Sequence, residues 1–306
     1  MLKNKKDLYS VLEVLRSLEY FNVQYYLGCK KVKLMRFFTE QNIDAVTVGI
    51  SGGVDSAVVY KLLLQVSQMY NSPLKKVVPL GVPITNSSHT NQEDTIRLGK
   101  LLSGEELEII DLGSTYQEMV GEVQRSFKSC ITQNIWAEGQ MGSVLRTPLF
   151  YYIAAILQAN GYRSIVSGTA NKSEFSYIGY FGKFSDNAVD IQPIADLYKS
   201  EVYQLAKLLN VPKEIINAEP KGDVWDNRTD YQMIGMDYDT LELVLRLKSV
   251  GKIQPQAVEY LLGSTINKDD FKYIQDCREQ VEKLHKINEH KYVKNDNLID
   301  VYSRGI

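Results

Sequence analysis

The stretch "VGISGGVDSAVVYKLL" at residues 48–63 decides the fold of this chain. An apolar, β-rich run from Ala45 to Ile50 leads into it, and apolar residues recur at helical spacing after it. Two glycines at a strand–helix junction let the backbone approach a ligand closely, and the start of the helix offers unpaired N–H groups and the positive end of its dipole. The stretch therefore predicts an anion site, and phosphate is its simplest occupant.

Strands and helices alternate around this junction. The expected helices lie at 6–27, 31–41, 55–70, 91–102, 115–128 and 143–159, and the expected strands at 44–50, 76–82, 106–111 and 164–167. This alternation predicts an α/β fold, a doubly wound parallel sheet with helices on both faces. Ligands of such folds bind at the carboxyl ends of the strands, here at 51–56 and 168–174. Helical segments at 1–42 and 238–306 flank the sheet within a single expected domain.

The composition is that of an ordinary globular protein. The 306 residues are 44% hydrophobic and 24% charged, and 35 basic against 37 acidic residues give a net charge of −2. This balance argues against a dedicated nucleic-acid or membrane-surface binder. No apolar run approaches a membrane span, and Cys29, Cys130 and Cys277 are too far apart for a metal motif. We therefore expect a cytoplasmic protein with reduced thiols.

The hexapeptide Ser51–Ser56 differs from a Walker A loop, because it lacks the lysine and the following Ser or Thr that such a loop needs. It resembles the SGGxDS loop of the ATP pyrophosphatase (PP-loop) group, whose members cleave ATP between its α and β phosphates. The resemblance implies ATP at Gly49, Ile50, Ser51, Gly52, Gly53, Val54, Asp55 and Ser56. Asp55 would supply a carboxylate for Mg²⁺. The alternative is a glycine-rich turn in which Asp55 is only the helix N-cap.

Further motifs narrow the family. They are GTANKSE at 168–174, GYFGK at 179–183, DIQPIADLYK at 190–199, RTD at 228–230 and DYD at 237–239. In this order they resemble NAD synthetase over approximately residues 35–295. The resemblance implies an adenine nucleotide alpha hydrolase-like, Rossmann-like fold. It also implies an amide ligase that converts deamido-NAD (nicotinic acid adenine dinucleotide), ATP and ammonia to NAD⁺, through an acyl adenylate and with release of pyrophosphate and AMP.

The chemistry of a carboxylate explains why ATP is needed. Its charge repels nucleophiles, and oxide is a poor leaving group, so ammonia cannot displace it directly. An acyl adenylate removes both obstacles. The protein must bring two anionic nucleotides together, neutralise them and position the reacting oxygen.

The resemblance gives individual positions roles. Mg²⁺ would be bound by Asp55 and Glu174. The catalytic residues would be Asp55, Ser56 and Lys199. Outside the loop, the positions matching ATP contacts are Thr169, Lys199 and Lys221, where a lysine meets phosphate as a point charge. The positions matching acceptor contacts are Arg146, Lys183, Asp190, His290 and Lys291.

The chain departs from the family pattern in the acceptor region. Residues 145–148 read LRTP where the family has ARxRM, so one arginine is missing, and Lys221 replaces a Ser or Thr. His285-Lys286 competes with His290-Lys291 as the match to the family's HKR segment. A paralogue that amidates a different carboxylate therefore stays open. The alternative outside catalysis is a degenerate nucleotide-binding module, against which the intact loop, Glu174 and Lys199 count.

The nitrogen donor and the assembly follow from the same resemblance. No stretch matches a glutaminase domain, and none of the cysteines lies in a nucleophile context, so free ammonia or ammonia from a separate glutaminase is implied. The family resemblance also implies a homodimer. The aromatic helix around 149–156 is either its interface or a helix of the core.

Overall fold

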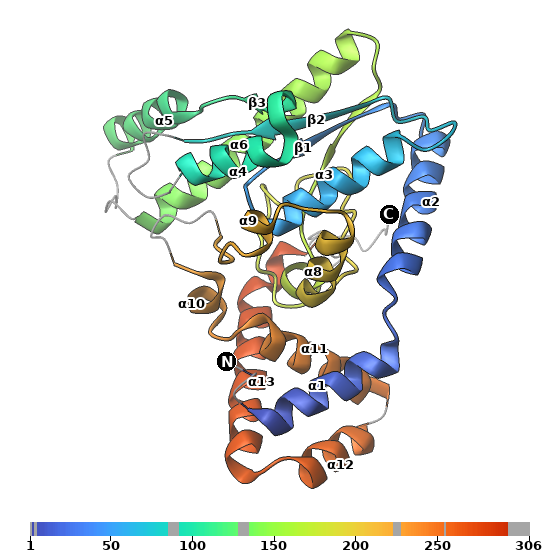
Figure 1. Cartoon of the computed structure of the whole chain (residues 1–306). Helices are drawn as coiled ribbons and strands as arrows, with labels where there is room; N and C mark the ends of the chain where they lie inside the picture. The colour runs from blue at the N-terminus through green and yellow to red at the C-terminus, as the bar shows by residue number, and fades with distance from the viewer. Residues whose placement is uncertain are drawn as a thin grey trace, which may run out of the picture.

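The computed structural model describes residues 2, 5–84, 92–127, 135–222, 228–253 and 255–292. Within these residues the sheet has four parallel strands, in the order β3-β2-β1-β4 (Figure 1). They are β1 (Ala45–Gly49), β2 (Lys76–Gly81), β3 (Glu108–Ile109) and β4 (Ser164–Ser167). The predicted parallel sheet is confirmed, although β3 is shorter than the expected strand at 106–111.

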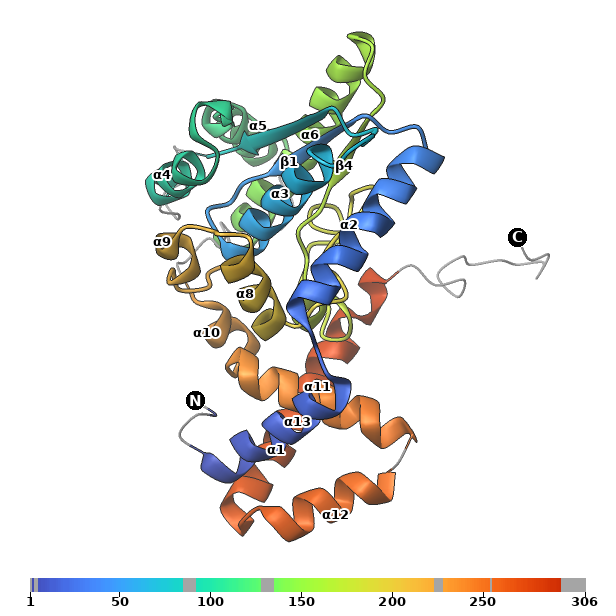
Figure 2. The ribbon, with the colours of Figure 1, turned by 45° about the vertical axis from the view of Figure 1, so that its right-hand side comes forward.

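Helices cover both faces of the sheet (Figure 2). Val46 and Val48 of β1 pack into the larger core with α2 (Val23–Glu40), α3 (Val54–Ser67) and α8 (Lys199–Leu208). On the opposite face Ala45 packs with Leu157 of α6 (Ile135–Ala159). Alternate side chains of one strand thus enter two different helix layers, as a doubly wound sheet requires.

A second hydrophobic core lies in the helical part of the molecule, at the lower end of Figure 1. It is built by α1 (Lys6–Glu19), α11 (Tyr238–Ile253), α12 (Pro255–Thr265) and α13 (Lys268–Asn288). Ile178 and Tyr198, which belong to the segments that follow β4, are buried in this core. The helical part is therefore packed directly against the carboxyl edge of the sheet, where the predicted site lies.

The remaining elements are short or peripheral. They are α4 (Gln92–Ser103), α5 (Gly113–Ser126), α7 (Lys172–Phe175), α9 (Lys213–Ile216), α10 (Asp230–Ile234) and the 3-10 turns η2 (Gly104–Glu106) and η3 (Glu289–Lys291). None of the helices described combines the length and hydrophobicity that a membrane crossing needs. Cys29 and Cys277 are free thiols, and Cys130 lies outside the described residues.

Two predicted helix boundaries are wrong. The break expected at 28–30 lies instead at Tyr20, which adopts a left-handed backbone (φ 36°), and Asn22, whose side chain caps α2. Gly28 is tolerated inside α2 because a helix interior accepts a glycine at about 1 kcal/mol. Helix α6 begins at Ile135 rather than at 143, so Pro148 lies near its middle instead of near its start.

Glu242 of α11 is buried beside two arginines. Arg16 of α1 donates to its two carboxylate oxygens at 3.0 and 2.6 Å, and Arg246 donates to it at 2.8 Å. Burial acts to raise the pKa of Glu242, but the hydrogen bonds and charges of the arginines outweigh it and hold this pKa below its usual range. A carboxyl group with a lowered pKa stabilises the fold above its unfolded pKa, and this contribution is lost as the pH falls through the folded value.

We expect Arg16→Met to reduce this pH dependence. In the wild type, the free energy of unfolding should fall through Glu242 as the pH is lowered from 7 through the folded pKa of this carboxyl group. The variant should lose about 3 kcal/mol at pH 7, because a buried carboxylate loses a partner, and should show a smaller further loss at low pH. Urea unfolding of both proteins at pH 7 and at low pH measures the loss of stability and its pH dependence. Equal pH dependence in the two proteins would contradict the conclusion that Arg16 lowers the pKa of Glu242.

Candidate active site

The backbone geometry of the loop requires glycine at two positions. Gly49 ends β1 against α6, and a Cβ there would lie 2.9 Å from Cζ of Phe150. Gly52 has a φ of 84°, in the left-handed region that glycine enters without steric cost. The chain can therefore turn from β1 into α3 within a few residues and leave its backbone close to any ligand at the end of the strand.

The two serines have different positions. Ser56 is 2% exposed, and its hydroxyl donates to the carbonyl of Gly53 at 3.0 Å and lies 3.2 Å from that of Ser51. Ser51 is exposed. Ser56 thus braces the loop from inside, while Ser51 faces outward. Gly53 is the N-cap of α3, so the alternative in which Asp55 caps the helix is wrong.

A buried lysine joins the two predicted magnesium ligands. Lys199, the first residue of α8, has a side chain that is 4% exposed, and its Nζ lies 2.5 Å from Oδ2 of Asp55 and 3.1 Å from Oε1 of Glu174. Asp55 follows β1 and Glu174 follows β4. The strand order reverses between these neighbours, because β2 pairs with the other edge of β1. This is the topological switch point, where α/β sheets bind their ligands.

Three further residues hold this cluster, and sequence reasoning gave them no role. Asn171 donates to Oδ1 of Asp55 at 2.9 Å and caps α7 by accepting from the amide of Glu174. The hydroxyl of Tyr238 lies 2.6 Å from carboxylate oxygens of both Glu174 and Asp230. All three lie inside the motifs at 168–174, 228–230 and 237–239, so these motifs were the sequence feature that could have identified them.

The cluster carries excess negative charge. Burial acts to lower the pKa of Lys199, but the charges of Asp55, Glu174 and Asp230 outweigh it and raise this pKa well above its usual range. Burial also raises the pKa of Glu174, reinforced by the two aspartates and opposed by Lys199 and Tyr238. One ammonium therefore faces three carboxyl groups, so the site favours a further cation.

Asp55 and Glu174 fit a magnesium ion by their donor chemistry. Mg²⁺ takes oxygen ligands and is usually held by one or two carboxylates together with phosphate oxygens and water. The ammonium between the two carboxylates shows that they can share one cation. Within the described ranges no group of three or more His, Cys, Asp or Glu residues is placed to hold a metal. The phosphates of a nucleotide would therefore complete the coordination.

The other two predicted ATP contacts differ in position. Thr169 is half-buried just beyond β4, next to Gly168, where a Cβ would lie 2.5 Å from Oε1 of Gln192. The backbone at this edge is thus closely packed. Lys221 is exposed, and its Nζ lies 3.9 Å from Glu219. Its contact with ATP stays a prediction.

The predicted acceptor residues from the C-terminal helix meet the segment 179–190. Lys183 donates to the carbonyl of His290 at 3.4 Å. Lys291 donates to the carbonyls of Gly179 and Phe181 at 3.0 and 2.8 Å. The turn η3 is therefore fastened to the segment that carries Lys183.

Arg146 and Asp190 already have bonding partners in the fold. Nε of Arg146 donates to the carbonyl of Val82 at 2.9 Å, and burial lowers the pKa of Arg146 to about 10, opposed by the charge of Asp186. Asp190 accepts from the amide of Val166 at 2.7 Å and from the hydroxyl of Tyr151 at 3.3 Å. Arg146 lies inside α6. Acceptor binding by either residue stays a prediction.

The two competing histidine–lysine pairs both contact this region. The ring of His285 stacks on Tyr177 at 3.9 Å, and its Nδ1 lies 2.8 Å from the carbonyl of the same residue. His290 is exposed, with Nδ1 3.0 Å from the carbonyl of Ile287. His285 thus holds the chain after α7, whereas His290 is exposed, and its contact with the acceptor stays a prediction.

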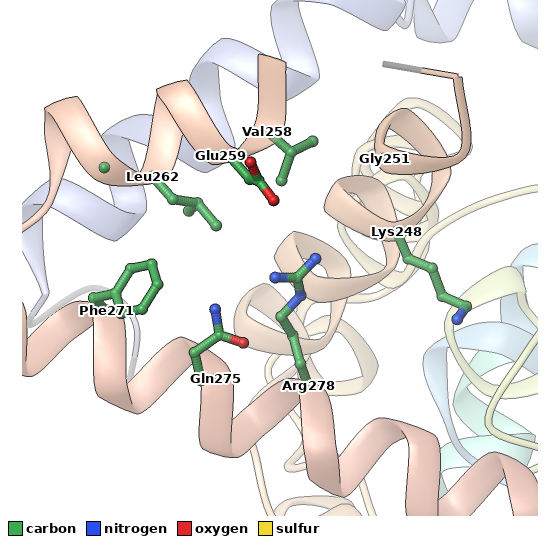
Figure 3. A pocket seen from close by; sticks show the side chains of 9 residues that line it. Lys248, Gly251, Val258, Glu259, Leu262, Phe271, Gln275 and Arg278 are labelled. Carbon is green, nitrogen blue, oxygen red and sulfur yellow. The ribbon is translucent and has the colours of Figure 1, made fainter. Parts of the chain in front are cut away.

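A separate cavity of about 620 Å³ lies among α11, α12 and α13 (Figure 3). It is lined by Lys248, Gly251, Val258, Glu259, Leu262, Gly263, Phe271, Gln275 and Arg278. None of the predicted site residues belongs to this lining. The cavity is therefore distinct from the cluster at the sheet edge.

Comparisons with known proteins agree with the motifs. The family model described as NAD synthase matches residues 30–293. The chain is 32% identical over 265 residues to the NH(3)-dependent NAD(+) synthetase of Methanocaldococcus jannaschii, covering 85% of this chain and 92% of that protein. It is 35% identical over 226 residues to the protein of the same name from Alkaliphilus oremlandii, covering 73% and 85%. Among solved structures, the NMN synthetase from Francisella tularensis matches with a TM-score of 0.66 and 25% identity, over 90% of this chain and 100% of that one.

Proposed function

The chain belongs to the NAD synthase family, and we propose that it amidates the carboxylate of deamido-NAD with ammonia, using ATP. The observation that carries the proposal is Lys199, whose ammonium lies between Asp55 of the pyrophosphate loop and Glu174 beyond β4. These charged groups meet at the switch point of the sheet, where a nucleotide binds. The cytoplasm, which holds such nucleotides, is the proposed location.

Each part of the site has a role in the proposed reaction. An oxygen of the acceptor carboxylate attacks the α-phosphorus of ATP, and pyrophosphate leaves against the amides and hydroxyls of the loop. Lys199 neutralises developing charge on the phosphates. Ammonia then attacks the acyl carbon, AMP leaves with the bonding electron pair, and the nitrogen loses a proton. Bound Mg²⁺, held by Asp55 and Glu174, would neutralise the phosphate charge.

A direct assay tests the function. Purified protein with ATP, Mg²⁺, ammonium and deamido-NAD should release one pyrophosphate for each NAD⁺ formed, and glutamine should not replace ammonium without a separate glutaminase. Turnover with a different carboxylate alone would support the paralogue. No pyrophosphate release with any acceptor would support a binding module without turnover.

A mononucleotide acceptor is the second candidate. The solved neighbour from Francisella tularensis is an NMN synthetase, whose product carries one nucleotide rather than two. In this chain the segment 145–148 keeps a single arginine, and that arginine is partly engaged by the carbonyl of Val82. Fewer free cations suit an acceptor with fewer phosphates. An assay of nicotinate mononucleotide beside deamido-NAD distinguishes the two candidate functions, because the ratio of the two kcat/KM values shows which acceptor the protein prefers.

We expect Arg146→Ala to raise the KM for deamido-NAD strongly, by about tenfold or more, with little change in the KM for ATP. Arg146→Lys should recover only part, because lysine supplies charge without the planar fork. Arg125→Ala is the control, since Arg125 is an exposed arginine that pairs with Glu122. Equal effects of Arg146→Ala on both substrates, or none, would place the acceptor elsewhere.

We also propose a homodimer formed through α6. Tyr152 is 65% exposed on this helix, and Tyr151 and Ile156 are exposed beside it, so the helix presents an aromatic face that suits a buried interface. Light scattering at micromolar concentration should give twice the chain mass of 34.8 kDa. Tyr152→Glu should shift the mass to that of a single chain. A wild-type mass of one chain would rule out a stable dimer.

A further inference from the structure

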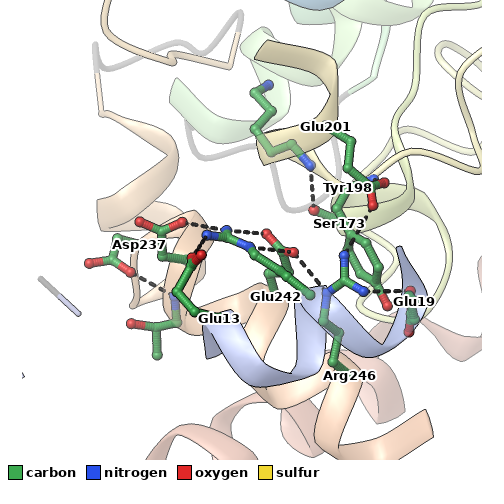
Figure 4. A network of polar contacts seen from close by, with 12 residues as sticks. Glu13, Glu19, Ser173, Tyr198, Glu201, Asp237, Glu242 and Arg246 are labelled. Atoms are coloured by element: carbon green, nitrogen blue, oxygen red, sulfur yellow. Dashed lines mark hydrogen bonds and ion pairs between the residues drawn. The ribbon is translucent and has the colours of Figure 1, made fainter. Parts of the chain in front are cut away.

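We propose that Arg246 is a positioning residue for Lys199, acting through Glu201 and Tyr198, and that helix α1 completes this device. The inference rests on the proposed function only for the role of Lys199. Arg246 lies in α11, and its side chain is 2% exposed (Figure 4). Its Nη2 donates to Glu201 at 3.0 Å, its Nε to Glu242 at 2.8 Å, and its Nη1 to Glu19 of α1.

Glu201 and Tyr198 place this arginine next to the first turn of α8. The second carboxylate oxygen of Glu201 accepts from the amide of Tyr198 at 2.8 Å. The guanidinium of Arg246 lies over the ring of Tyr198, with Cζ 4.2 Å from its centroid. Arg246 therefore contacts the residue before Lys199 and the residue two positions after it.

The remaining contact of this turn comes from α7. The amide of Lys199 donates to Oγ of Ser173 at 3.0 Å, and Ser173 immediately precedes Glu174. The backbone of Lys199 is thus fixed from α7 and, through its flanking residues, from α11. From this fixed turn its side chain reaches Asp55 and Glu174.

The chemistry of the ion pairs around Arg246 indicates that they position the first turn of α8 rather than stabilise the fold. Removing several charges from water costs more than their attraction usually returns, so packed apolar residues would stabilise these helices equally well. What the arginine adds is directed hydrogen bonds to two other helices, α1 and α8, and to Glu242 of its own helix. Glu19 lies outside the residues 30–293 that match the family, so the contribution of α1 belongs to the N-terminal segment of this chain.

Three variants separate positioning from stability. Arg246→Met removes the charge and keeps the length of the side chain. Glu201→Gln keeps an acceptor for the amide of Tyr198, as Gln232 provides for Thr229 in α10 at 2.9 Å, but weakens the pairing with Arg246. Lys5→Met is the matched control, because it breaks the 2.7 Å pair of Lys5 with Asp270 of α13 without touching α8. The measurements are kcat, KM, thermal unfolding and amide hydrogen exchange at residues 199–203.

We expect Arg246→Met to lower kcat by about 100-fold and Glu201→Gln by about tenfold, with the KM for the acceptor unchanged, because a small misplacement of a catalytic charge is costly. Exchange at 199–203 should accelerate in both and not in Lys5→Met, which should lower only the unfolding temperature. Unchanged kcat, or equal exchange in all three, overturns the proposal. If Arg246→Met does not fold, Glu201→Gln decides alone. A wild type without turnover refutes the proposed function, and the exchange data still decide the positioning.

Discussion

Lys199→Met should lower turnover by about 1,000-fold, because it removes the buried charge nearest the carboxylates that would hold the phosphates and their metal. It should also destabilise the fold by about 3 kcal/mol, since Asp55 and Glu174 lose the ammonium that separates them. Pyrophosphate release, measured at a temperature where circular dichroism shows the variant folded, distinguishes the two effects.

Lys207→Met is the control for that experiment. Lys207 lies in the last turn of the same helix, α8, and is exposed. Its replacement should leave both turnover and stability near the wild-type values. If Lys199→Met retained a tenth or more of the wild-type turnover, the lysine would serve structure alone, and the observation that carries the proposed function would be lost.

The core of the site was readable from the sequence because its parts lie in short, local motifs. Short apolar, β-rich runs placed β1 and β4, and the segment that follows each strand carries Asp55 or Glu174. In a parallel sheet, residues after neighbouring strands meet at one edge, so the convergence follows from the fold class. The lysine that joins them came from the family resemblance and not from its spacing.

The supporting residues could not be placed in the same way. Tyr238 reaches Glu174 from α11, a helix of the separate helical core, and its approach depends on how two layers pack. Such a contact between distant segments leaves no periodicity to detect. The break at Tyr20 was missed for a related reason, because a left-handed tyrosine carries no local signal and Gly28 offered a misleading one.

The roles of the predicted acceptor residues stay predictions, because their contacts within the fold do not show what they bind. Lys183, His290 and Lys291 meet around residues 179–183, whereas Arg146 and Asp190 form hydrogen bonds with backbone groups of Val82 and Val166. A motif match gives a position in the chain but not the partner that a side chain selects. The residues that define the acceptor must therefore be found by comparing substrates.

Asp55→Asn isolates the charge of one carboxylate. The asparagine has nearly the same shape, and its oxygen can still accept from Asn171, which donates to Oδ1 of Asp55 at 2.9 Å. The fold should therefore stay intact. Turnover should fall by about two orders of magnitude or more, because a neutral amide is a weak ligand for Mg²⁺ and cannot balance Lys199. Glu174→Gln should behave alike.

Asp196→Asn is the matched control for this variant. Asp196 also pairs with a lysine, since Nζ of Lys30 lies 2.9 Å from both of its oxygens, but this pair joins α2 to the chain before α8 and includes no residue of the loop. Each substitution removes one carboxylate charge from a pair with a lysine, although the side chain of Asp196 is 56% exposed and that of Asp55 is 19% exposed. A loss of turnover confined to Asp55→Asn would show that removing a carboxylate from a lysine pair is not sufficient to cause it. Raising the Mg²⁺ concentration should restore part of the activity of Asp55→Asn if the carboxylate holds the metal. Near-normal turnover at every Mg²⁺ concentration would remove Asp55 from the metal site and leave it only as a partner of Lys199.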